Sequence, residues 1–279
     1  MKNMKKIIYT LAIIGLVFGA CDKIEEPFLE EIVTGGGDNN IHLEIRFLEN
    51  LTGKYNLNVF ITESGLISAQ KNDLASIGPT PDWLDYEHNH ILRNSLTGSW
   101  GIDLIEDPTV DTVITKEIPF NIEDEWVSEN LSIIVFISKE DTREIIQVEE
   151  QNTMNSLKDH LKKVLLEEFT GHICVNCPEA TILAHDLKDS YGEQLILLSI
   201  HAGDLAVPGN EPFDTEYRTM AGSDIFNYFQ PVGVPTGMVN RTDYQGGTIL
   251  FKDSWEPAIT KQMELPPPAS IDIIIELAQ

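Results

Sequence analysis

The chain has 279 residues, enough for one to three domains, and its 42% hydrophobic and 8% aromatic content is sufficient for packed cores. Its 19 basic residues stand against 45 acidic ones, which gives a formal net charge of −26. Such a field would repel nucleic-acid phosphates and anionic lipid headgroups, so we expect neither a nucleic-acid partner nor attachment through a basic patch. We interpret the acidity as favouring solubility.

The N-terminus has the order of an export signal. Lysines precede an apolar segment, residues 7–18, which is too short to span a bilayer, and small residues then lead directly to Cys21. This order resembles a bacterial lipobox, and the alternative is an ordinary secretory signal with an incidental cysteine. We predict a signal peptide in residues 1–20 and membrane attachment through lipidated Cys21. The polar, glycine-rich residues 21–40 are predicted to form a flexible tether.

A β-domain is predicted for residues 41–152. Apolar and polar residues alternate over 41–47 with the period of two that a half-buried strand requires, and 132–137 is almost continuously apolar, as a central strand would be. Further strand candidates are residues 57–61, 100–105 and 144–148. Short strands separated by polar turns, without an amphipathic helix, indicate an Ig-like β-sandwich.

Strands and helices alternate in residues 158–265, where a second domain is predicted. A strand at 163–169 and a fully buried strand at 195–200 flank a helix that begins near Pro178 and ends at Gly192. The later elements expected are a helix at 215–229, an antiparallel pair at 238–240 and 248–250, and a helix from Ser254 to Met263. This order predicts an α/β thioredoxin-like layer, so the fold class expected for the chain is α+β.

A triple proline separates this region from residues 266–279, which are expected to form a C-terminal strand at 269–275. The strand either pairs back onto an existing sheet or begins a further domain.

A Cys-x-x-Cys motif, Cys174 and Cys177, stands where the first strand of this region gives way to its helix. The free N–H groups of a helix N-terminus stabilise a thiolate, so we predict a redox pair with Cys174 as the exposed attacking thiol and Cys177 as the buried resolving thiol. Two alternatives stay open. One is an inert disulfide, and the other is a zinc site completed by His172 and His201, for which a second such motif is missing.

Three further residues are candidates for the same site. The order Gly-Val-Pro-Thr around Pro235 predicts a cis-proline loop against the cysteines, and residues 202–215 an irregular insertion beside it. His172, as a cation, would lower the thiol pKa, whereas otherwise it is a loop histidine. Glu168, or the adjacent Glu167, would relay protons if buried. We favour an edge or solvent position for them because acids are seldom buried.

His88 and His90 would face the same way on a strand, which suggests a metal site. A third ligand is not evident, so surface or core positions are expected, and we predict no metal and no cofactor. The sequence contains no Ser-His-Asp order, P-loop or dinucleotide fingerprint.

Residues 165–178, read as Leu-Leu-Glu-Glu-Phe-Thr-Gly-His-Ile-Cys-Val-Asn-Cys-Pro, resemble the signature of a family of Gram-negative outer-membrane lipoproteins, the outer-membrane-protein-twenty-eight family. Other blocks that resemble the family are residues 88–93, 100–101, 199–203 and 233–241. The resemblance implies an outer-membrane location, a thioredoxin fold and a site of Cys174, Cys177 and Pro235. Longer relatives continue into another β-region, which we expect to be absent here.

Two functions follow as hypotheses. The first is a membrane-anchored thiol–disulfide oxidoreductase that acts on protein thiols or disulfides outside the cytoplasm. The second is a non-catalytic surface-binding or structural lipoprotein in which the Cys-x-x-Cys pair is an inert disulfide.

Overall fold

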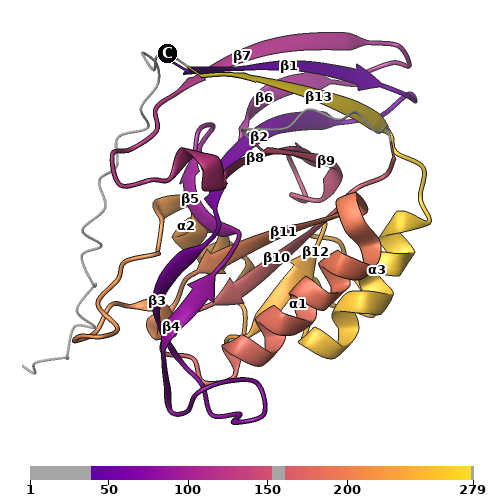
Figure 1. Ribbon diagram of the computed structural model, residues 1–279. Coiled ribbons are helices and arrows are strands. Elements are labelled where there is room, and N and C mark those ends of the chain that lie inside the picture. The colour runs from indigo at the N-terminus through magenta and orange to yellow at the C-terminus, as the bar shows by residue number, and fades with distance from the viewer. Residues whose placement is uncertain (1–38, 153–160, 278–279) are drawn as a thin grey trace, which may run out of the picture.

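The computed structural model describes residues 39–152 and 161–277, and within them the chain is α+β (Figure 1). The strands are β1 (Asn39–Phe47), β2 (Lys54–Glu63), β3 (Leu66–Lys71), β4 (Asp82–His88), β5 (Ile91–Ser95), β6 (Ile102–Glu106), β7 (Val113–Phe120), β8 (Leu131–Lys139), β9 (Ile145–Asn152), β10 (Val164–Thr170), β11 (Leu195–His201), β12 (Thr236–Val239) and β13 (Ala269–Glu276). The helices are α1 (Cys177–Tyr191), α2 (Met220–Phe229) and α3 (Trp255–Met263), with 3-10 turns η1 (Ser128–Asn130), η2 (Gly192–Gln194), η3 (Asp204–Ala206) and η4 (Lys252–Ser254).

The predictions for the N-terminal residues 1–38, including the signal peptide and Cys21, lie outside the described residues. The last two residues of the predicted tether, 39 and 40, belong to β1.

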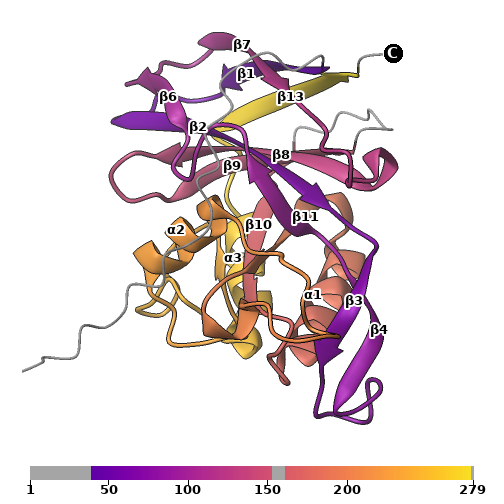
Figure 2. The same ribbon diagram turned by 90° about the vertical axis from the view of Figure 1, so that its left-hand side faces the viewer.

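The smaller sheet has the order β13-β1-β7, and β1 is antiparallel to both neighbours. Ile41, Leu43, Ile45 and Phe47 alternate along β1 and are buried, which confirms the strand predicted there. Figures 1 and 2 show this sheet lying over β2, β6 and β8. The side chains that pack against it from the larger sheet are Tyr55, Leu57, Val59, Ile61, Leu131, Ile133, Val135 and Ile137. Burial of this apolar surface holds the two layers together.

The larger sheet has the order β12-β10-β11-β5-β2-β8-β9, and β6 also pairs with β2. Its strands β10 and β11 are parallel, whereas β12 is antiparallel to β10. The link between the two halves of the chain is β5, where Ile91 pairs with Ser199 of β11. The sheet therefore runs through the predicted boundary between residues 41–152 and 158–265, and the division into those two domains stays a prediction.

Helices cover both faces of β10, β11 and β12. Val164 and Leu166 of β10 point into a core shared with α1 and α3, whereas Leu165 and Phe169 point into a core shared with α2, β2 and β8. This split follows from the pleat of a strand, which sends successive side chains to opposite faces. Figure 1 shows α1 and α3 on the same face.

Several boundaries differ from the prediction. The helix expected at 215–229 begins only at Met220, because Thr219 is extended and its side chain caps the helix by accepting a hydrogen bond from Gly222 N. The pair expected at 238–240 and 248–250 is reduced to single bridges, Gly237 with Leu250 and Tyr244 with Gly247. The last helix begins after Ser254, but that serine makes no side-chain capping bond.

The C-terminal strand forms as predicted, and it adopts the first of the two arrangements considered for it. β13 pairs with β1 along its length, so residues 269–275 pair back onto an existing sheet. Strands β3, β4, β5 and β7 were not predicted.

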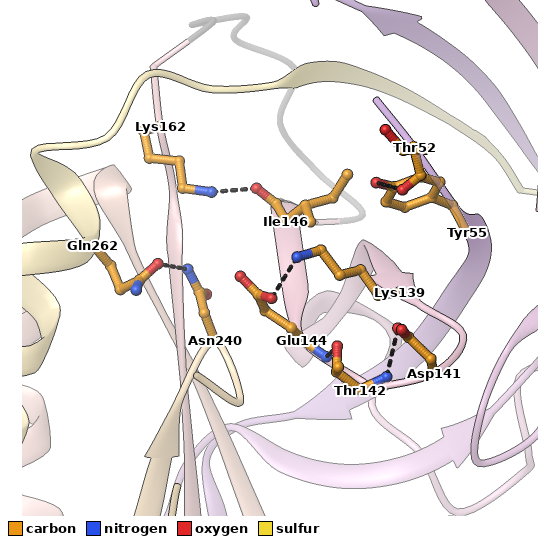
Figure 3. Close-up of polar contacts among 10 residues, drawn as sticks. All are labelled: Thr52, Tyr55, Lys139, Asp141, Thr142, Glu144, Ile146, Lys162, Asn240 and Gln262. Carbon is orange, nitrogen blue, oxygen red and sulfur yellow. Dashed lines mark hydrogen bonds and ion pairs between the residues drawn. The ribbon is translucent and has the colours of Figure 1, made fainter. Parts of the chain in front are cut away.

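The junction between β9 and β10 contains a buried lysine (Figure 3). Lys162 donates to Ile146 O from a side chain that is almost fully buried, and burial lowers its pKa to about 8. Nearby, Asn240 donates to Gln262 at 3.2 Å, and Lys139 forms an ion pair with Glu144 at 2.6 Å. Of these contacts, the one between Lys162 and Ile146 joins the two halves of the chain.

Candidate functional site

The two cysteines form a disulfide at the start of α1. Cys177 is the first residue of the helix, and the Cα atoms of Cys174 and Cys177 lie 5.5 Å apart. A tight turn after β10 precedes them, in which Cys174 N donates to Gly171 O at 3.0 Å. Pro178 occupies the first turn of α1, where its missing N–H costs nothing. The predicted disulfide and its position at a strand–helix junction are confirmed.

Both cysteines are buried, with 2% of Cys174 and 1% of Cys177 exposed. The expectation of an exposed Cys174 is therefore wrong. The reason is that other segments cover the turn: Val234 O lies 3.8 Å from Cys174 Sγ, and Leu205 O accepts a hydrogen bond from Ile173 N. The Leu205 contact places part of residues 202–215 beside the cysteines.

Pro235 lies at the same end of the sheet as the disulfide. Phe169 of β10 pairs with Thr236 of β12, so the loop before Thr236 meets the turn that follows β10. The Val234–Pro235 peptide bond is cis. The structure therefore brings Pro235 and the cysteines together, and the catalytic role of the proline stays a prediction.

The two acids of β10 are buried, and the edge or solvent position favoured for them is wrong. β10 has β11 and β12 at its two edges and packed apolar cores on both of its faces, so every residue of the strand is buried. Glu168 accepts a hydrogen bond from Thr181 Oγ1 of α1 at 2.9 Å, and burial raises its pKa to about 8. This carboxyl group therefore titrates near neutral pH.

Glu167 points the other way and binds Arg241 through two hydrogen bonds, of 2.7 and 2.6 Å. Both side chains are fully buried. Sequence reasoning did not identify Arg241 as the partner, although two adjacent acids on an apolar strand are a signal that a buried cation is required.

His172 is buried beside Phe213, and burial lowers its pKa. A neutral imidazole does not stabilise a thiolate by charge, so the geometry does not favour the cationic role considered for His172. Its ring also stacks near that of His201, whose pKa burial lowers well below the usual value. His88 joins this group, with its ring 5.5 Å from that of His201, and burial lowers its pKa to about 3.

The hairpin of β3 and β4 lies against the turn that carries the cysteines, and sequence reasoning missed it. Gln70 Nε2 donates to Cys174 O at 2.9 Å and to Gly171 O at 3.3 Å. Lys71 N donates to His172 O at 2.7 Å. A signal that would have found the second strand is its content of strand-forming aromatics, Trp-Leu-Asp-Tyr, ahead of His88.

A small cavity of about 10 Å³ lies beside Cys177 and has room for roughly one water. It is lined by Cys177, Thr181, His88 and His201, among others. Within the part of the chain described, no group hydrogen-bonds to Nε2 of His88 or to either ring nitrogen of His201. Cys177 therefore borders a cavity that polar side chains line in part.

His90 does not share a strand face with His88. His90 lies in the turn between β4 and β5 with a φ of 56°, and its ring faces His185 of α1 at 5.4 Å. Over residues 39–152 and 161–277, no group of three or more His, Cys, Asp or Glu side chains is arranged to hold a metal ion. None of the helices in these ranges has the length and apolar character needed to cross a membrane.

Comparison with known proteins gives one match. The model of the family described as "Outer membrane protein Omp28" matches residues 30–156. The match includes the β3–β4 hairpin and ends before the Cys-x-x-Cys motif, so the blocks around Cys174 and Pro235 lie outside it. No curated protein and no solved structure matches the chain.

Proposed function

We propose that this chain, of which residues 30–156 match the Omp28 outer membrane protein family, is a thiol–disulfide oxidoreductase tethered to the outer membrane by lipid on Cys21. Its substrates are thiols or disulfides of proteins outside the cytoplasm. The pair Cys174 and Cys177 carries the exchange, and the loop of Pro235 borders it.

The observation that carries the proposal is the series of neighbours that leads from Cys177 through Thr181 to the buried carboxyl group of Glu168. Cys177 and Thr181 line the same cavity, and Thr181 holds the carboxyl group of Glu168. Because the pKa of Glu168 is raised to about 8, this group gains or loses a proton near neutral pH. A resolving thiol must lose a proton to attack, and we propose that Glu168 accepts this proton by way of Thr181.

In the reducing direction, the thiolate of Cys174 attacks a substrate disulfide, and the leaving sulfur departs as a thiolate that is then protonated. Cys177 gives its proton to Glu168 and attacks the mixed disulfide. The substrate leaves as a dithiol and the Cys174–Cys177 bond re-forms, so two electrons pass to the substrate. A dithiol donor outside this chain restores the reduced pair, and the reverse sequence oxidises a substrate dithiol.

We also propose that β10, β11 and β12 with their helices form a thioredoxin-like unit, and that the smaller sheet and β2, β6 and β8 form an Ig-like sandwich. The parallel β10-α1-β11 connection, the antiparallel β12 and the helices on both faces support the first. The apolar core between two sheets supports the second.

A second candidate function is a non-catalytic surface or structural lipoprotein with an inert disulfide. The burial of both cysteines favours it, because a sulfur that thiols cannot reach does not exchange.

An insulin-reduction assay with dithiothreitol as donor separates the two. The wild-type chain should accelerate insulin precipitation, and a Cys177→Ala variant should accumulate mixed disulfides with substrate proteins on Cys174. A Cys174→Ala variant is the matched control. Wild-type activity no greater than that of the control would leave the inert disulfide as the function.

The lipid anchor has its own test. In a Gram-negative host, the wild-type chain should fractionate with outer membranes, and mass spectrometry should find acyl chains on Cys21. A Cys21→Ser variant should be released as unacylated protein. Retention of that variant in the membrane fraction would exclude lipid on Cys21 as the attachment.

A further inference from the structure

The β3–β4 hairpin covers the cysteine turn with a ladder of polar contacts. Gln70 binds Cys174 O, Lys71 N donates to His172 O, and Asp73 N donates to Val175 O at 3.3 Å. The hairpin thus follows the turn from His172, two residues before the first cysteine, to Val175, which lies between the two cysteines. Because one of these contacts is to Cys174 itself and the others are to its near neighbours, the hairpin contributes to the burial of Cys174, which is only 2% exposed.

The hairpin is held by these polar contacts and by the buried side chains of Ala69 and Tyr86, outside the main apolar cores. Its strands pair only with each other among the described strands, and none of its residues belongs to the three apolar clusters found in the described chain. Its large apolar residues Ile67 and Leu84 point outward and are each 61% exposed. On the inner side, Ser68 accepts a hydrogen bond from Tyr217, and His88 packs against rings. Segments with few buried apolar contacts open at lower free energy than the whole fold.

Both ends of the hairpin leave the larger sheet at special backbone positions. Gly65 follows β2 with a φ of 75°, and His90 precedes β5 with a φ of 56°. The two positions are tied together, since Gly65 N donates to Asn89 Oδ1 at 2.8 Å and His90 N donates to Ser64 Oγ at 3.0 Å. The paired ends form a narrow base at which the hairpin joins the larger sheet.

We propose that residues 66–88 are a lid that closes over the disulfide, and that thiols reach Cys174 only after the lid swings away about residues 64–65 and 89–90. The lid comes from the part of the chain that matches the Omp28 family model, and the disulfide comes from the part that does not. The inference deepens the proposed function by adding control of access. Its test measures only how readily a reagent reaches the disulfide, so a failure of the lid proposal can be told apart from a failure of the proposed catalysis.

The test is the rate at which dithiothreitol reduces the disulfide of the folded full chain. Both thiols of the reagent become a cyclic disulfide, and the two protein sulfurs gain two electrons and two protons. Samples are quenched with acid at timed intervals, labelled with maleimide and weighed by mass spectrometry. The variants are Gln70→Ala, which removes the contacts to Cys174 O and Gly171 O, and the control Gln151→Ala on β9, whose exposed amide donates to Asn152 O.

Native wild type should be reduced far more slowly than the same chain in urea. Loss of the Gln70 contacts should speed reduction about fivefold or more, because this factor corresponds to the net stabilisation that such hydrogen bonds provide. Gln151→Ala should be reduced at the wild-type rate. Equal rates for native and unfolded wild type, or for Gln70→Ala and wild type, would overturn the lid.

Amide hydrogen exchange of the wild-type chain tests the lid without any variant. The amides of residues 66–88, including those of Lys71 and Asp73, should exchange together and faster than those of β2 and β8. Exchange of the hairpin only with global unfolding would contradict the proposal.

Discussion

The side chain of Gln70 donates a hydrogen bond to the carbonyl oxygen of Cys174, a residue 104 positions further along the chain. This bond joins a hairpin of the front half of the protein to the turn that carries the disulfide. Because the carbonyl belongs to the cysteine itself, a change in the hairpin alters the surroundings of the sulfur directly. Both halves of the chain thus contribute to the surroundings of the disulfide.

Glu168 should make the protein less stable as the pH rises. Its pKa is about 8 in the folded protein against an ordinary 4.5, so the folded state keeps a proton that the unfolded state loses between these values. The stabilisation is complete below pH 4.5 and is lost as the pH approaches 8, with an expected size on the order of 3 kcal/mol. Glu168→Gln stays neutral and should flatten this dependence, measured by urea unfolding at pH 5 and 8. Glu179→Gln, at an exposed position of α1, should keep the wild-type slope.

The buried histidines should make the protein less stable as the pH falls. Burial lowers the pKa of His88 to about 3, so between pH 6.5 and 3 the unfolded state binds a proton that the folded state excludes. This contribution to stability is complete above pH 6.5 and is lost on acidification, by about 2 kcal/mol between pH 6.5 and 5. His88→Gln should reduce the loss seen in urea unfolding at those two pH values. His42→Gln, on β1 of the smaller sheet beside Glu117 and Glu276, should not reduce it.

Local pattern was enough for the elements whose environment is set by their own neighbours in the chain. The alternation of Ile41, Leu43 and Ile45 identified β1, and the order of strand, Cys-x-x-Cys and Pro178 identified the start of α1. Both signals lie within a few residues, because the period of a strand and the free N–H groups of a helix start are local properties.

What the sequence did not reveal depends on residues far apart in the chain. Glu167 is buried because Arg241, 74 positions away, supplies the opposite charge, so a rule based on the acid alone places it wrongly in solvent. Cys174 is covered by Gln70, and β3, the strand of Gln70, lacks the apolar alternation that would predict it, since its inward contacts are polar. Distant polar partners of this kind leave little periodic signal.

The Glu167–Arg241 pair should be the most sensitive polar contact of the larger sheet. Arg241→Met leaves a buried carboxylate without its partner, which should lower the free energy of unfolding by about 3–5 kcal/mol. The double variant Glu167→Gln with Arg241→Met should recover a large part of this loss, because no charge then remains buried. Urea unfolding at pH 7 measures both. A double variant no more stable than Arg241→Met would show that the cost comes from packing against Phe136 and Phe229 and not from the unpaired charge.

Gly171 is required because the chain after β11 passes directly over it. A Cβ at this position would lie well inside van der Waals contact with the backbone of Leu205, and backbone cannot move aside as a flexible side chain does. Gly171→Ala should therefore lower stability by about 1–3 kcal/mol and speed reduction of the neighbouring disulfide as the turn shifts. Gly209→Ala is the matched control, since its added Cβ meets only Phe213 O at 3.8 Å and should leave both quantities unchanged. Thermal unfolding measures the loss of stability, and the rate of reduction by dithiothreitol measures the change at the disulfide. A Gly171→Ala variant with wild-type stability and a wild-type reduction rate would show that the turn can accommodate a Cβ at this position.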